Sequence, residues 1–97
     1  MENYNKIVVA DDEDMCRKVA VRICRLVAPK IEVYEVSNGR DLVEKVRQNN
    51  CAFILTDNDM PLMRGLEAVV EIRSFNPHIP ICLISGGSLT EEEVYKA

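Results

Sequence analysis

The chain has 97 residues, 47% of them hydrophobic and 29% charged, and a formal net charge of −4 at pH 7. This length accommodates one domain at most, and the negative charge argues against direct nucleic-acid binding, which uses basic surfaces. The N-terminus lacks a signal-peptide pattern, and no apolar run approaches the roughly 20 residues of a membrane helix. We therefore expect one cytoplasmic domain that binds neither nucleic acid nor membrane.

In the first half of the chain, apolar runs alternate with helical patterns, which favours parallel strands joined by crossover helices. The predicted elements are a strand at 6–10, a helix at 14–28, a strand at 31–36 and a helix at 41–48. Apolar residues share one face of the first helix, namely Met15, Val19, Ile23 and Leu26. Lys18, Arg22 and Arg25 form a separate basic stripe, either a solvated face or a partner-docking face. The second helix should turn Leu42, Val43 and Val46 inward and pair Asp41 with Lys45.

The second half continues this alternation. We expect a strand at 52–56, a helix at 66–75, a strand at 79–85 and a last helix opened by a capping box at Thr90 and Glu93. The helix at 66–75 should turn Val69 and Ile72 inward. The strand at 52–56 is almost wholly apolar, as a central parallel strand should be. The chain ends at Ala97, inside the last helical pattern, so the strand at 79–85 should be an exposed sheet edge through which copies associate.

Acidic residues follow two of the predicted strands. Asp57 comes directly after the apolar run at 51–56, and the cluster Asp11-Asp12-Glu13-Asp14 follows the first strand. If these strands are parallel neighbours, their carboxylates meet at one sheet edge, where repulsion is unfavourable unless a cation joins them. This pattern indicates a magnesium-assisted aspartyl phosphorylation site.

The same segments resemble the receiver domain of two-component response regulators. The resemblance rests on residues 8–12 at the first strand, Asp57-Asn58-Asp59-Met60-Pro61 with Gly65-Leu66-Glu67 after the third, and residues 81–85 at the fourth. It implies an α/β fold with a flavodoxin-like, doubly wound parallel sheet of order 2-1-3-4-5. Here the order would be 2-1-3-4, since the chain ends before a fifth strand and helix.

The resemblance also implies roles for individual residues. Asp57 would accept a phosphoryl group from a phosphohistidine on a sensor histidine kinase or phosphotransfer protein. Asp12 and Asp57 would bind Mg²⁺ directly, Asp11 mostly through water and Asp59 through its carbonyl group. Ser85 would hydrogen-bond the new phosphoryl group.

The sequence departs from the family pattern in two ways. The lysine that ends the fifth strand in the family has no counterpart, because Lys96 falls in the fourth-helix pattern. Asp59 stands two positions after the phosphoacceptor, and Arg64 occupies a loop position where the family often has Asp or Asn. The Asp59 side chain is either solvated or a determinant of the lifetime of the phosphate.

Two other functions remain open from the residues alone. The missing lysine leaves room for a receiver-like interaction module that is never phosphorylated. A haloacid-dehalogenase-like phosphatase would also place an Asp-x-Asp pair after a strand, as at Asp57 and Asp59, but it would place that pair near the start of the chain. The receiver interpretation, a phosphoacceptor signalling domain rather than an enzyme, explains more of the sequence.

Overall fold

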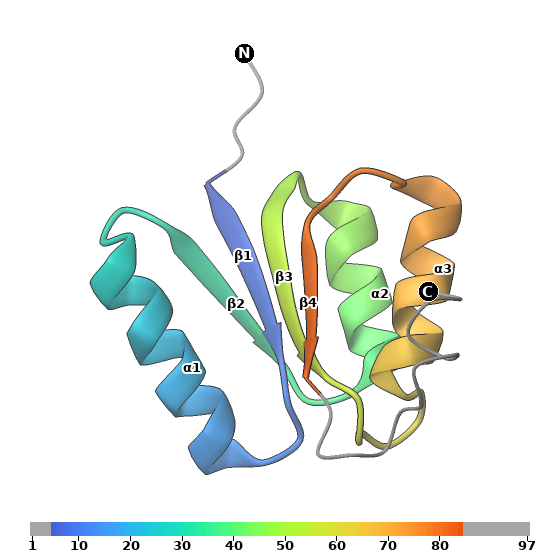
Figure 1. Ribbon diagram of the computed structural model, residues 1–97, viewed down its shortest axis with the longest axis horizontal. Helices are drawn as coiled ribbons and strands as arrows, with labels where there is room; N and C mark the ends of the chain where they lie inside the picture. Colours follow the sequence, from blue (N-terminus) through green and yellow to red (C-terminus); the bar gives the residue numbers. More distant parts are fainter. Residues whose placement is uncertain (1–4, 85–97) are drawn as a thin grey trace.

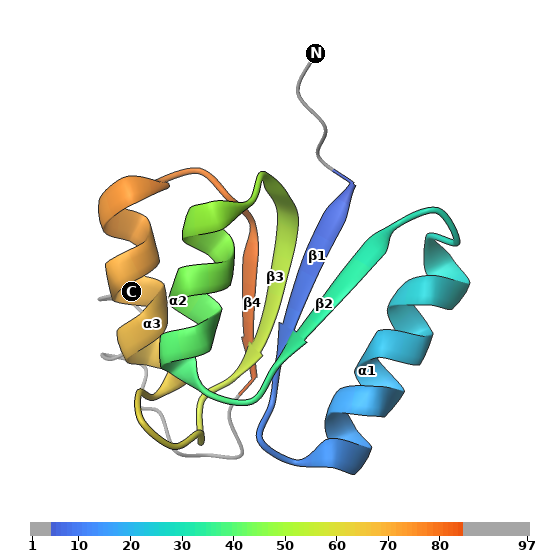
Figure 2. The same ribbon diagram turned by 180° about the vertical axis from the view of Figure 1, so that it is seen from behind.

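The computed structural model describes residues 5–84, which form a sheet covered by helices on both faces (Figures 1 and 2). The elements, in chain order, are β1 (Lys6–Ala10), α1 (Asp14–Val27), β2 (Glu32–Val36), α2 (Gly39–Gln48), β3 (Cys51–Asp57), α3 (Gly65–Phe75) and β4 (Ile81–Ile84). Helix α1 covers one face over β1 and β2, and α2 and α3 pack together on the other face. No helix within residues 5–84 is long and apolar enough to cross a membrane.

The four strands are all parallel and lie in the order β2-β1-β3-β4, which confirms the predicted fold class and order. After β2 the chain crosses back over β1 and enters the sheet on its other side as β3. The carboxyl ends of β1 and β3 therefore flank a topological switch point, the place where open α/β sheets bind ligands.

The main core lies between the sheet and the α2–α3 layer. Its fully buried side chains include Val8 of β1, Ile54 of β3, Leu42 of α2 and Ile72 of α3. The predicted inward residues of both helices, Leu42, Val43, Val46, Val69 and Ile72, are all buried. Helical spacing was sufficient to identify this face.

The start of α2 differs from the prediction. The helix begins at Gly39, two residues early, because the Asn38 side chain caps it by accepting a hydrogen bond from the Asp41 N–H at 2.8 Å. The Asn38 side chain also donates to the Asp41 carboxylate at 3.0 Å.

The prediction that Asp41 and Lys45 form an ion pair is wrong. The Lys45 ammonium lies 4.9 Å from the centre of the Tyr34 ring instead.

The predictions for α3 and β4 are confirmed with shifted boundaries. Helix α3 begins at Gly65, and β4 begins at Ile81, so Pro80 precedes the strand. Among the described strands, β4 is an edge that pairs only with β3. Ser85, the capping box at Thr90 and Glu93, and Lys96 lie outside the described residues.

Helix α1 has the predicted extent to within one residue, but its apolar face is not covered. Met15, Val19, Ile23 and Leu26 are each more than half exposed, and only Val21 is buried. The helix rests on β1 and β2 through another side, and no element within residues 5–84 packs over these four side chains.

Candidate metal and phosphoacceptor site

Strand register brings the two predicted acidic groups together. Ala10 of β1 pairs with Thr56 of β3, so the residues that follow them, Asp11 and Asp57, lie at the same level of the sheet. Both parallel strands end at this level, so Asp11 and Asp57 lie at the carboxyl edge of the sheet. The position of each acid was readable from the sequence, whereas their equal level depends on the register.

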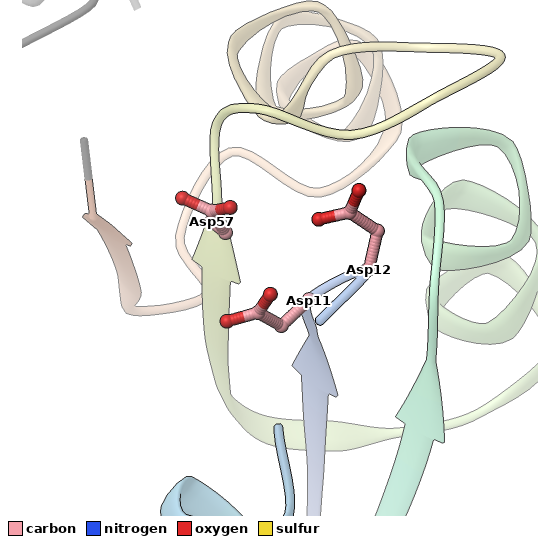
Figure 3. A group of neighbouring side chains, drawn as sticks. All are labelled: Asp11, Asp12 and Asp57. Atoms are coloured by element: carbon pink, nitrogen blue, oxygen red, sulfur yellow. The ribbon is translucent and has the colours of Figure 1, made fainter. Parts of the chain in front are cut away.

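The carboxylates of Asp11, Asp12 and Asp57 form one cluster (Figure 3). One oxygen of each lies within 4.8 Å of the others. Asp11 and Asp57 are half-buried and Asp12 is exposed. Hard carboxylate oxygens at this separation suit a small dication such as Mg²⁺, which retains several water ligands and needs only one or two carboxylates.

The electrostatic environment of Asp57 fits such a site. Burial, followed by repulsion from Asp11, raises the pKa of the Asp57 carboxyl group, although backbone hydrogen bonds from Asn58 and Asp59 partly oppose the increase. The nearby acids also raise the pKa of the exposed Cys16 thiol, Glu13 contributing most, with smaller contributions from Asp11 and Asp57. A cation would relieve this concentration of negative charge.

The loop between β1 and α1 has a defined local structure. The Asp11 N–H donates to the Val36 carbonyl at 3.1 Å, and the Asp11 carboxylate accepts from the Glu13 N–H at 2.9 Å. Helix α1 starts at Asp14, so the partial positive charge of its N-terminus lies close to the acids and favours them.

The loop between β3 and α3 is held by Asn58, which is fully buried. Its N–H donates to the Ile84 carbonyl at 2.9 Å, and its own carbonyl accepts from the Gly65 N–H at 3.0 Å. Its side-chain oxygen accepts from the Leu66 N–H at 2.9 Å. Asn58 therefore ties the end of β3 to β4 and α3, a role that its sequence position did not reveal.

A groove of about 370 Å³ opens beside the acids on the α1 side of the sheet. Asp11, Asp57 and Asp59 line one part, and Cys16, Leu55 and Ile84 line another. Asp59 thus borders the same opening, although the carboxylate cluster itself comprises Asp11, Asp12 and Asp57.

Sequence reasoning also missed Arg17 of α1, which lies near the acids. Its guanidinium contacts the Asp11 carbonyl, Asp14 and Glu35. The spacing of three residues between Asp14 and Arg17 was a signal that could have pointed to this pair.

Comparison with known proteins identifies the family. The family model of the response regulator receiver domain matches residues 7–97 of the sequence. The chain belongs to this family. The matched segment contains every acid of the cluster, and two-component signalling through a phosphoacceptor domain is the general role of receivers.

The chain is similar in sequence to curated proteins and in fold to proteins of known structure. It is 33% identical over 86 residues to the transcriptional regulatory protein SrrA of Staphylococcus aureus, a match that covers 89% of the receiver but only 35% of SrrA. The receiver domain of the histidine kinase CKI1 from Arabidopsis thaliana, complexed with Mg²⁺ and BeF₃⁻, is 27% identical with a TM-score of 0.76, over 95% of this chain and 72% of that one. A chain in the crystal structure of histidine kinase ThkA in complex with response regulator protein TrrA is 25% identical with a TM-score of 0.82, over 100% of this receiver and 81% of that chain.

Proposed function

We propose that residues 1–97 act as one receiver domain that accepts a phosphoryl group on Asp57, with Mg²⁺ bound at the cluster. The observation that carries this proposal is the approach of the Asp11, Asp12 and Asp57 carboxylates to within 4.8 Å at the carboxyl ends of β1 and β3. The Mg²⁺ in the CKI1 receiver structure supports the choice of cation.

In this proposal the residues have distinct roles. Asp12 and Asp57 ligate the cation directly, Asp11 acts through water, and the Asp59 carbonyl group supplies another ligand. The cation offsets the repulsion between an anionic phosphoryl group and the attacking carboxylate. Ser85 is proposed to hydrogen-bond the phosphoryl group because it follows β4, whose last residue, Ile84, pairs with Asp57.

The phosphoryl donor is proposed to be a phosphohistidine on a histidine kinase or phosphotransfer protein, in line with the kinase complex among the similar structures. An Asp57 carboxylate oxygen attacks the phosphorus atom. The phosphorus–nitrogen bond breaks, and its electron pair returns to the imidazole, which then takes up a proton. The product is an acyl phosphate on Asp57.

Intact-mass spectrometry tests this function. Incubation with acetyl phosphate or phosphoramidate and Mg²⁺ should add one phosphoryl group to the wild-type chain and to Asp59→Asn, but not to Asp57→Asn. A label that persists in Asp57→Asn and disappears in Asp59→Asn would place the acceptor two residues later. A folded chain that binds Mg²⁺ but takes no label would favour the interaction module, and turnover of a phosphate ester would favour the phosphatase.

A further inference from the structure

Arg17 has an unusual position for a cation next to an acidic site. Its side chain is only 12% exposed, and within residues 5–84 its hydrogen bonds go to other groups than the carboxylates of the cluster. Instead, one terminal nitrogen donates to the main-chain carbonyl of Asp11 at 2.9 Å. The guanidinium therefore holds the backbone from which Asp11 and Asp12 project.

The other two contacts fix the guanidinium itself. Its Nε atom donates to Glu35 of β2 at 3.0 Å, and its second terminal nitrogen donates to Asp14 at 2.6 Å. Asp14 is 79% exposed, so this pair contributes little. Glu35 is 34% exposed and belongs to a strand of the central sheet, which makes it the firmer anchor. The planar guanidinium makes these contacts from three separate nitrogen atoms, whereas a lysine carries all of its donors on one nitrogen.

We propose that Arg17, anchored by Glu35, is a positioning residue for the divalent-cation site. Three carboxylates within 4.8 Å of one another repel, and without restraint the loop after β1 would relax away from Asp57. Arg17 opposes this relaxation through the Asp11 carbonyl, so the ligands are arranged before the cation arrives. The proposal rests on the cation binding described under the proposed function.

The test measures cation affinity separately from stability. Binding of Mn²⁺, followed by electron paramagnetic resonance with Mg²⁺ as competitor, gives the dissociation constants, and thermal melts without metal verify that each variant is folded. Arg17→Lys should weaken affinity about tenfold, at the low end of the roughly 10–100-fold losses seen for groups that orient metal ligands. Glu35→Gln should cost about threefold, because a neutral acceptor gives about half the free energy of a charged one.

Arg22→Lys is the matched control. Arg22 lies on the same helix, is exposed, and makes no ion pair within residues 5–84, so its variant should bind the cation as the wild type does.

A second measurement separates a positioning role from a role in phosphoryl transfer itself. At saturating Mg²⁺, Arg17→Lys should be phosphorylated by acetyl phosphate at the wild-type rate, because bound cation restores the ligand arrangement.

The outcomes separate this proposal from the proposed function. Equal affinity in wild type, Arg17→Lys and Glu35→Gln, in a chain that binds Mg²⁺, would overturn the positioning role and leave the proposed function intact. An equal loss in Arg22→Lys, or slow phosphorylation of Arg17→Lys at saturating Mg²⁺, would also overturn it. A folded wild-type chain that binds no cation would overturn both.

Discussion

Asp57 combines a central position in the sheet with an unfavourable charge environment. It ends β3, is half-buried, and lies opposite Asp11. Burial and the neighbouring acids oppose its ionisation. This environment should lower the free energy of unfolding of the metal-free protein, and replacement of Asp57 measures by how much.

Replacement of Asp57 should therefore stabilise the protein when no metal is present. The folded pKa of Asp57 is raised above 3.8, so the native state binds its proton more tightly than the unfolded state does, and stability falls as pH rises between these two pKa values. Asp57→Asn removes that loss. In EDTA, denaturant unfolding should show a higher free energy of unfolding for Asp57→Asn at pH 7, and the difference from wild type should shrink as pH falls toward 4. A constant difference across this range would contradict the assignment.

Leu62 adopts a left-handed backbone conformation, with φ of 66°, in the loop between β3 and α3. A side chain in this region costs about 1–2 kcal/mol, and glycine avoids that cost at an entropic loss of roughly 0.5–1 kcal/mol. Because the Leu62 side chain is 75% exposed, little burial is lost on its removal. Leu62→Gly should raise the free energy of unfolding by about 0.5–1 kcal/mol in urea denaturation. Leu62→Ala, which keeps the Cβ atom, should not.

At the scale of elements, α3 begins directly against the end of β3. A Cβ atom on Gly65 would lie 2.2 Å from the Asp57 carbonyl oxygen and 3.0 Å from the Asn58 Cα atom. Both neighbours are backbone atoms at the site, so no side chain can rotate away to make room. The helix can approach β3 this closely because residue 65 has no side chain.

Gly65→Ala should thus affect both stability and the site. We expect a loss of about 1–3 kcal/mol in the free energy of unfolding, typical of overpacking, together with weaker Mg²⁺ binding because Asp57 is displaced. Gly39→Ala provides the comparison, since its Cβ atom would lie 2.2 Å from the Met63 carbonyl oxygen instead. It should lose similar stability yet keep Mg²⁺ affinity, as measured by calorimetric titration. Equal affinities in the two variants would argue against coupling between α3 and the site.

At the scale of the whole molecule, we expect cation binding to be linked to folding. Asp11 and Asp12 follow β1 and Asp57 ends β3, two strands that are adjacent only in the folded sheet, so the unfolded chain offers no comparable site. At 100 times the dissociation constant, Mg²⁺ should add roughly 2.7 kcal/mol to the free energy of unfolding. Thermal melts with and without Mg²⁺ measure this gain, which Asp12→Asn should reduce and Glu44→Gln, an exposed acid on α2, should leave unchanged. A melting temperature independent of Mg²⁺ would count against the site.

The exposure of the apolar face of α1 also depends on how the whole molecule packs. The helical pattern predicted that Met15, Val19, Ile23 and Leu26 share a face, yet packing within residues 5–84 leaves that face exposed. Periodicity reports which side chains lie together on a helix and does not report what covers them. Self-association through β4 likewise stays a prediction, although β4 is an edge of the described sheet.

The sequence by itself determined the order of the elements, the inward faces of α2 and α3, and the acids at two strand ends. These features depend on local periodicity and on neighbours in the chain, which are visible without a fold. Only the tertiary structure decided that Asp11, Asp12 and Asp57 converge, because their approach depends on the pairing of Ala10 with Thr56, residues that are far apart in the chain. It also decided the contacts of Arg17 with Glu35 and the burial of Asn58, because a polar side chain acquires such a role only when folding brings its partners within hydrogen-bonding distance.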